Sequence, residues 1–225
     1  MKTISVAIDG PAGAGKSTIA RQLAAELGFR YVDTGAIYRT VAYFMDLWGV
    51  SPRDADGVNR YIDELTIGIE YDEDGLQHMI MNGMDVTGDI RTPEISQKAS
   101  LISAHACVRE MLLDMQREEA ARHDVIMDGR DIGTVVLPKA TVKIFLTASA
   151  EVRAKRRFEE LTANGEKVDY DTILKEIQQR DYQDTHREIA PLKMSRDSIK
   201  VDTSQMTIEE AVAAIRAIVR EKTGL

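Results

Sequence analysis

Residues 10–17, with the sequence GPAGAGKS, are almost bare of side chains until they end in a lysine and a serine. They satisfy the spacing G-x-x-x-x-G-K-[ST], whose fixed positions here are Gly10, Gly15, Lys16 and Ser17. Glycine lets the main chain curl so that successive N–H groups point inward, and phosphate oxygens can approach without meeting a Cβ. The ammonium group can bridge terminal phosphates, and the Ser17 hydroxyl can ligate Mg²⁺. The stretch therefore predicts a site for a polyphosphate and magnesium.

The flanking sequence favours this interpretation over the alternative, a flexible glycine-rich turn. Residues 3–8 (TISVAI) are short and apolar, as in a buried strand, and residues 17–28 show helical spacing up to Gly28, where a C-cap is expected. Strand, loop and helix is the context that the motif requires. We expect the whole loop to bind the donor nucleotide. Its residues are Gly10, Pro11, Ala12, Gly13, Ala14, Gly15, Lys16, Ser17 and Thr18.

An acidic residue at the end of another strand would complete a magnesium site. The apolar run VIMD ends in Asp128, which could hold a metal-bound water. A turn-forming aspartate is the alternative for this residue. A guanine-reading Asn-Lys-x-Asp motif is absent from the sequence, which argues against a GTPase.

Arginines supply the remaining candidates for phosphate chemistry. Arg153, Arg156 and Arg157 share one helix face and precede a glycine-containing stretch, as in a closing lid whose arginines meet the transferred phosphate. The alternative is a solvated basic face paired with the glutamates that follow. Arg180 and Asp184 also share a face, either at a cleft or as a structural i,i+4 salt bridge.

Composition limits the class of protein. The chain has 225 residues, a formal net charge of −8 and one cysteine, Cys107. The acidic charge argues against nucleic-acid binding, and the lone cysteine fits a reducing cytoplasm. Scattered histidines make zinc improbable, and no apolar run is long enough for a membrane span. We expect a cytoplasmic α/β protein without membrane or nucleic-acid partners.

Strand and helix patterns alternate along most of the chain, which predicts a doubly wound parallel sheet with helices on both faces. Residues 67–83 are predicted to form an antiparallel hairpin around an Asp-Gly turn, as an insert within the polar region 51–91. Thr92 and Pro93 should begin one long, bent helix that runs to His123. The last helix should begin with a capping box at Thr207.

Several stretches, in order and over nearly the whole chain, resemble the bacterial cytidylate kinases. They are IDGPAGAGKST, DTGAIYR, GMDVTGDIRTPEIS, DGRDIGTVV, VKIFLTAS and RDYQDTHREIAPL. The resemblance implies the P-loop core of nucleoside monophosphate kinases with a lid and an acceptor domain that carries a small antiparallel sheet. It places the core in residues 1–35, 101–150 and 172–225, the acceptor domain in 36–100 and the lid in 151–171.

The resemblance also implies residue roles. Thr34, Arg39, Arg130 and Arg187 would hold the acceptor phosphate; Ser100, Arg109 and Asp131 would read cytosine; Arg180 and Asp184 would bind the ribose hydroxyls; and Lys16, Arg130, Arg153 and Arg157 would be catalytic. The implied reaction transfers the γ-phosphoryl group of ATP, with Mg²⁺, to CMP or dCMP in pyrimidine metabolism. Other acceptors, and a nucleotide-binding regulator without turnover, are the alternatives. We expect a monomer.

Overall fold

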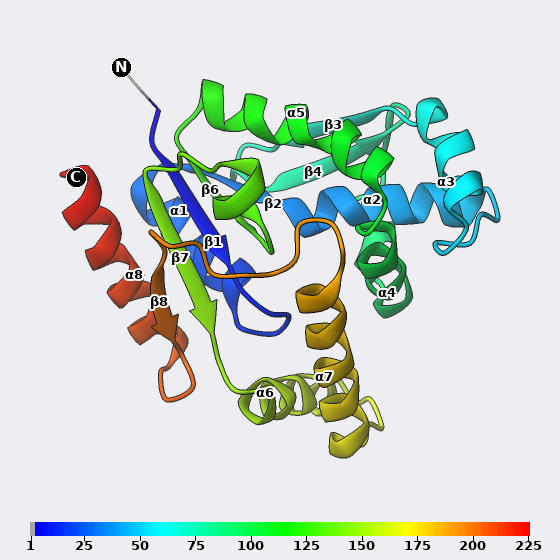
Figure 1. The fold of residues 1–225 in the computed structure, drawn as a ribbon. Coiled ribbons are helices and arrows are strands. Elements are labelled where there is room, and N and C mark those ends of the chain that lie inside the picture. Colours follow the sequence, from blue (N-terminus) through cyan, green and yellow to red (C-terminus); the bar gives the residue numbers. More distant parts are fainter. Residues whose placement is uncertain (1–2) are drawn as a thin grey trace.

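The computed structural model describes residues 3–225 and contains a central sheet of five parallel strands in the order β2-β6-β1-β7-β8 (Figure 1). The strands are β1 (Ser5–Asp9), β2 (Arg30–Asp33), β6 (Val125–Gly129), β7 (Val142–Thr147) and β8 (Ile199–Asp202). In register, Asp9 of β1 lies beside Gly129 of β6, and Asp33 of β2 lies beside Asp128. The carboxyl ends of three strands therefore meet at one edge of the sheet.

Helices cover both faces of this sheet, which is why its central strand is apolar on both sides. Val6 and Ile8 face α1 (Lys16–Leu27) and α8 (Ile208–Thr223), whereas Ala7 faces α2 (Thr34–Leu47) and α5 (Ala106–Arg122). The doubly wound architecture predicted from the alternating pattern is confirmed. Gly28 does end α1 in the left-handed conformation, and Thr207 and Glu210 do form the capping box of α8.

The inserted region lies beyond the β2 edge and extends away from the core (Figure 1). It contains the predicted hairpin, β3 (Ile67–Tyr71) and β4 (Gln77–Met81), to which a short third strand, β5 (Met84–Asp85), is added. A helix that the sequence did not suggest, α3 (Ala55–Tyr61), precedes it, with the short turns η1 (Ile62–Glu64) and η2 (Asp89–Arg91) on either side of the small sheet.

The single long helix predicted from Thr92 to His123 is wrong, because the structure has two helices there. Thr92 caps α4 (Pro93–Ile102) as expected, but the chain turns before α5 begins. At the break, the Ser103 hydroxyl donates to the Ser100 carbonyl, and the His105 ring contacts the Pro52 carbonyl at 2.8 Å. The Ala104 and His105 amides donate to the carbonyls three residues earlier, both at 3.1 Å, so the last turn of α4 tightens before the chain leaves the helix.

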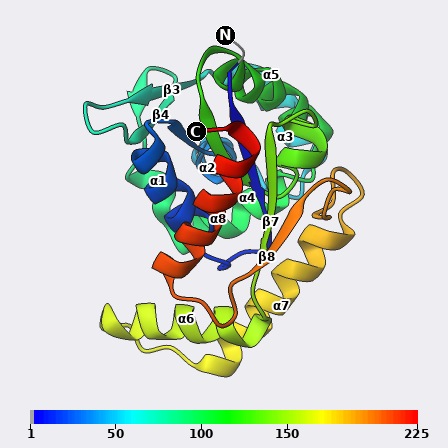
Figure 2. The same cartoon turned by 90° about the vertical axis from the view of Figure 1, so that its left-hand side faces the viewer.

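Two helices form an arm at the carboxyl edge of the sheet, α6 (Ala150–Ala163) and α7 (Tyr170–His186) (Figures 1 and 2). They share a small apolar cluster of their own, built on Ala154, Leu161 and Ile173. Between β6 and β7, residues Ile132–Val136 form one π-helical turn, η3. Within residues 3–225, no helix is both long and apolar enough to cross a bilayer.

Candidate active site

The loop between β1 and α1 is shaped by glycines. Gly13 and Gly15 have φ of 74° and 86°, in the left-handed region that glycine adopts without strain. A Cβ on Gly10 would lie 1.9 Å from the carbonyl oxygen of Leu146. Because the residue that caps α1 is Gly15, which lacks a side chain, the first amides of the helix are left to bind an anion.

Lys16 lies within the curve of this loop, where its Nζ donates to the Pro11 carbonyl at 2.8 Å. The side chain is buried, and desolvation together with the nearby Arg130 guanidinium lowers the pKa of Lys16. A buried ammonium group beside other cations is unfavourable on its own, and a bound polyphosphate would relieve that cost.

A hydroxyl and a carboxylate face each other where α1 approaches the end of β6. The Ser17 hydroxyl donates to Asp128 Oδ2 at 3.0 Å, and the Tyr31 hydroxyl donates to Asp128 Oδ1 at 2.9 Å. Burial raises the pKa of Asp128, with the nearby Asp33 carboxylate acting in the same direction. Hydroxyl and carboxylate oxygens are ligands that Mg²⁺ accepts, so the donor set fits this ion.

A cavity of about 210 Å³ opens in front of the loop. Lys16 and Ser17 line it on one side, together with Ala12 and Gly13. The cavity also brings together all the residues assigned above to the acceptor, which come from five separate segments. They are Thr34, Arg39, Ser100, Arg109, Arg130, Asp131, Arg180, Asp184 and Arg187.

At one end of the cavity, a carboxylate is held by two arginines. Asp131 accepts from Arg109 and, at 3.3 Å, from Arg187, and all three side chains are buried. Burial raises the pKa of Asp131, while the two guanidinium groups oppose that shift. The Ser100 hydroxyl is buried here and has no hydrogen-bond partner within the described part of the chain. It is available to a ligand.

Nearer the loop, the cavity is lined by cations. The Arg130 Nε donates to Asp184 Oδ2 at 2.6 Å, so Asp184 pairs across the cavity wall and not with Arg180, one turn away on α7. The Nε atoms of Arg180 and Arg39 are buried and without partners among residues 3–225. Desolvation and Arg130 lower the pKa of Arg180. These guanidinium groups can bind the negatively charged oxygens of phosphates.

Comparison with known proteins places this geometry in a family. A family model described as cytidylate kinase matches residues 6–221. The chain belongs to the cytidylate kinase family. It is 50% identical to a cytidylate kinase of Lactobacillus johnsonii over 97% of this chain and 95% of that protein. It is 48% identical to one of Carboxydothermus hydrogenoformans over 98% and 99% of the two chains. The kinase fold also matches a solved structure of an uncharacterized protein from Eubacterium ventriosum, with TM-score 0.52, 14% identity and coverage of 98% and 99%.

The three arginines predicted for the lid of this nucleotide kinase lie outside the cavity, and Arg156 donates to the Thr203 carbonyl at 2.7 Å. Arg153 is buried, donates to the Ala12 carbonyl at 2.9 Å and pairs with Asp181 of α7 at 3.0 Å. It therefore lies behind the loop. Arg157 is partly exposed and pairs with Glu160 at 2.9 Å, which agrees with the alternative, a solvated face paired with glutamates. Neither lines the cavity, so their catalytic role stays a prediction.

Sequence reasoning missed several residues of the site of this cytidylate kinase family member. Asp33 accepts from the Ala36 amide at the start of α2 and pairs with Arg39 at 3.0 Å. Tyr38 lines the cavity, and the Arg109 guanidinium lies 5.7 Å from its ring centroid. Asp33 is the N-cap of α2, and an aspartate shortly before a helical pattern is a signal for such a cap. A tyrosine on an amphipathic helix carries no comparable signal.

Proposed function

We propose that the protein transfers the γ-phosphoryl group of ATP to CMP or dCMP, giving ADP and CDP or dCDP, and that it serves pyrimidine nucleotide metabolism in the cytoplasm. One observation carries the proposal. A loop of the phosphate-binding type and a carboxylate held by two arginines line the same cavity, together with arginine nitrogens that have no partner within residues 3–225. The donor and the acceptor base can thus be bound at opposite ends with their phosphates between the cations.

In this proposal, the loop amides and Lys16 bind the donor phosphates, and Ser17 with Asp128 holds Mg²⁺. The ion would supply neutralisation of the charge on the transferred phosphoryl group. Arg39, Arg130 and Arg187, with the Thr34 hydroxyl, bind the acceptor phosphate. The attacking group is a phosphate oxygen that is already ionised at neutral pH. Catalysis therefore requires alignment and charge neutralisation rather than a protein base.

The acceptor base would be selected at Asp131. Cytosine presents an N4 amine, which an ionised carboxylate accepts, beside ring acceptors to which Arg109 and Ser100 can donate. Uracil presents O4 at the same place, so its lone pairs would face those of Asp131 without a hydrogen bond. Arg180 and Asp184 bind the ribose hydroxyls.

We further infer which residues form each functional part of the chain. Residues 151–171 act as the lid, residues 36–100 bind the acceptor, and residues 1–35, 101–150 and 172–225 form the core. Ala154 and Leu161 of this lid pack with Ile173 of α7 in an apolar cluster apart from the two larger ones, which supports a lid that moves together with the start of α7. We expect a working monomer, since one chain supplies both the donor and the acceptor side of the cavity.

The direct test is a panel of acceptors. With ATP and Mg²⁺, release of ADP should be coupled to CMP and dCMP and be much weaker with UMP and AMP. Comparison of CMP with dCMP then measures the preference for the ribose. Absence of turnover with CMP, or equal turnover with all four nucleotides, would overturn the proposal.

Replacing the base reader tests the selectivity separately. Asp131→Asn leaves one acceptor oxygen and introduces a donor, so the ratio of kcat/KM for CMP over UMP should fall by about 10-fold to 100-fold. Asp72→Asn, an exposed carboxylate of the small sheet's hairpin, serves as the control and should leave the ratio unchanged. An unaltered ratio in Asp131→Asn would remove this residue from base reading.

A further inference from the structure

The residue proposed to read the base is part of an unusual turn. The Asp131 carbonyl accepts both from the Val135 amide, at 2.8 Å, and from the Val136 amide, at 3.2 Å. The Leu137 amide donates to Ile132 at 2.7 Å, which closes the π-helical turn η3 directly after Asp131. Such turns are rare and frequent at functional sites. The direction of the Asp131 side chain therefore depends on how this turn is held.

A second buried carboxylate holds the start of the turn. Asp9 Oδ1 accepts from the Ile132 amide and Oδ2 from the Gly133 amide, each at 2.7 Å. Asp9 is 3% exposed, so water cannot easily replace its carboxylate as the acceptor for these two amides. Only an ionised carboxylate offers two acceptor oxygens at this size, because an asparagine presents one oxygen and one donor.

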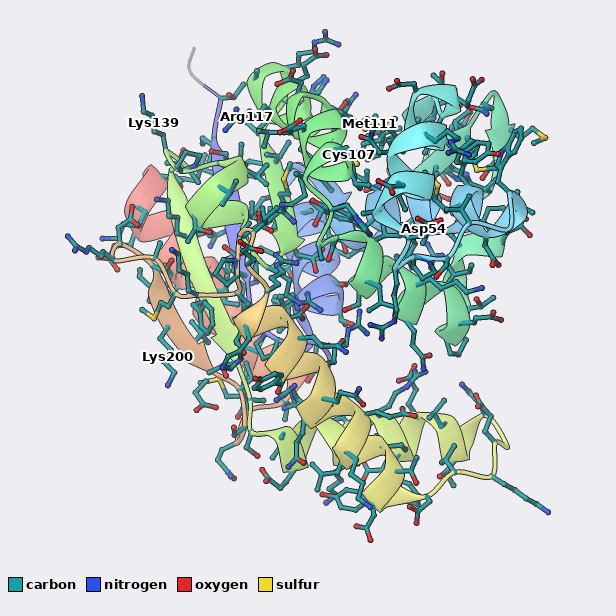
Figure 3. All side chains as sticks on the ribbon, turned by 45° about the vertical axis from the view of Figure 1, so that its right-hand side comes forward. Asp54, Cys107, Met111, Arg117, Lys139 and Lys200 are labelled. Carbon is teal, nitrogen blue, oxygen red and sulfur yellow. The ribbon has the colours of Figure 1, made fainter. Side chains whose placement is uncertain are left out.

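An arginine holds the other end of the same turn. Arg117 of α5, labelled in Figure 3, donates from Nε to the Val136 carbonyl and from a terminal nitrogen to the Val135 carbonyl, both at 3.1 Å. The turn thus has an anion at its amide end and a cation at its carbonyl end, which complements its dipole. These are the same two valines whose amides bond the Asp131 carbonyl.

The fit at the amide end is close. A Cβ on Gly133 would lie 3.3 Å from Asp9 Oδ2 and 3.2 Å from the Cδ of Lys143, so the glycine allows the carboxylate to approach the main chain. Burial raises the pKa of Asp9 to about 6, the nearby Asp131 acting in the same direction and Lys16 opposing it. Keeping this carboxylate ionised at neutral pH lowers the free energy of unfolding. A side chain that only filled space would not have this cost.

We propose that Asp9 is a positioning residue for acceptor selection, which with Arg117 holds η3 so that the Asp131 carboxylate is aimed at the base. The proposal rests on the proposed function. Asp9 is also the last residue of β1 and directly precedes Gly10. The Asp9 side chain therefore links the start of the donor loop to η3, the turn that follows Asp131. It fixes the position of the loop relative to the residue proposed to select the base.

The test compares acceptor selectivity with donor binding. Asp9→Asn keeps the volume but leaves one of the two amides without an acceptor, so the ratio of kcat/KM for CMP over UMP should fall about 10-fold. The KM for ATP should change less than about 3-fold, since the loop glycines and Lys16 remain. Arg117→Gln should lower the same ratio by a smaller factor, about 2-fold to 5-fold, because the Asp9 bonds persist.

Two matched variants control for general damage. Asp124 Oδ1 accepts from the Ile4 amide at 2.6 Å at the opposite end of β6, so Asp124→Asn makes the same chemical change at a carboxylate–amide contact far from the cavity. Arg122 lies on α5 like Arg117 but pairs only with Glu118 on the surface, at 3.1 Å, so Arg122→Gln is its counterpart. Both should keep the wild-type ratio.

The outcomes separate the two levels of inference. If wild-type protein does not turn over CMP, the proposed function fails and the role of Asp9 fails with it. If wild type uses CMP and UMP equally, transfer to CMP stands but the inference about Asp9 is wrong. If wild type prefers CMP but Asp9→Asn and Arg117→Gln lower kcat/KM for both nucleotides equally, the turn is only structural and the inference about Asp9 is wrong. Should Asp9→Asn not fold, the Arg117→Gln ratio decides, since that side chain is partly exposed.

Discussion

The two walls of the cavity are built by different means. The wall proposed to bind the donor, here called the donor wall, is one continuous segment, residues 10–17, that offers main-chain amides and a single lysine. The wall proposed to bind the acceptor, here called the acceptor wall, is built from side chains directly after β6 and on α2, α4, α5 and α7, several of which pair with one another. A phosphate site made of main-chain amides requires only glycines and the start of a helix. A site made of side chains requires the whole fold to bring its residues together.

This difference sets how each wall responds to substitution. Main-chain amides survive almost any replacement, so the donor wall is vulnerable only at its glycines and at Lys16. Several charged residues of this wall are halves of ion pairs, as in the pairing of Arg130 with Asp184, and removing one partner leaves the other uncompensated. We therefore expect few but large effects on the donor side and several graded effects on the acceptor side.

The largest effect on turnover is expected at Lys16. Lys16→Met removes the only lysine that lines the cavity within the described residues, and kcat should fall by about 10²-fold to 10³-fold. The KM for CMP should change little, because the acceptor wall stays intact. Lys200→Met, at an exposed position of β8 labelled in Figure 3, should retain full activity. Steady-state kinetics with both substrates varied would measure this. A loss of CMP affinity equal to the loss of turnover would contradict the separation of the two walls.

Glycines should reveal the main-chain mould. Gly10→Ala puts a Cβ against the Leu146 carbonyl, at 1.9 Å in the present backbone, and should lower the free energy of unfolding by about 3 kcal/mol or more. Gly28→Ala is the control, since Gly28 has φ of 69° and nothing within 4 Å of the added Cβ. It should cost only the strain of the left-handed conformation, about 1 kcal/mol. Denaturant unfolding of both variants measures the difference. Equal losses would mean that close packing at Gly10 is unimportant.

The contrast between the walls also explains what the sequence could predict. The donor loop is local, so its motif, the strand before it and the helix after it were all readable. The hairpin was readable because its turn residues lie within it. The third strand, β5, has two residues and follows a left-handed Asn82, a length too short for any periodicity. The break between α4 and α5 depends on the contact of His105 with Pro52, which is distant in sequence.

The acceptor wall shows the same limit. The resemblance to a family identified its residues, but their pairing is a property of the fold. Asp184 and Arg180 have the spacing of an intrahelical salt bridge, yet Asp184 pairs with Arg130 because β6 ends beside α7. Asp9 follows the apolar strand predicted for residues 3–8, and its contact with η3, more than a hundred residues away, left no mark in the local pattern.

A smaller effect is expected at Arg39, on the acceptor wall. Its guanidinium pairs with Asp33, and its Nε has no partner in residues 3–225. Arg39→Met should raise the KM for CMP by about 10-fold to 100-fold, the worth of a charge-assisted hydrogen bond, while the KM for ATP stays within about 2-fold. Arg60→Met, on the exposed surface of α3, is the control in the same region. If both substrates lose affinity alike, Arg39 does not belong to one wall.

The smallest effect concerns Asp9, which lies where the two walls join. Burial raises the pKa of Asp9 from 3.8 in the unfolded chain to about 6, so the folded protein holds this proton more tightly than the unfolded chain does. Its contribution to stability is therefore fully present below about pH 4 and is lost as the pH rises through 6. Between pH 5 and pH 8 the loss amounts to about 1.4 kcal/mol, one pKa unit.

Asp9→Asn cannot titrate, so its stability relative to wild type should improve by this amount over the same interval. Denaturant unfolding at the two pH values measures the change, and the other ionisable groups cancel in the comparison. If the difference in free energy of unfolding between wild type and Asp9→Asn is the same at both pH values, burial does not raise the pKa of Asp9 and ionising this carboxylate costs no stability.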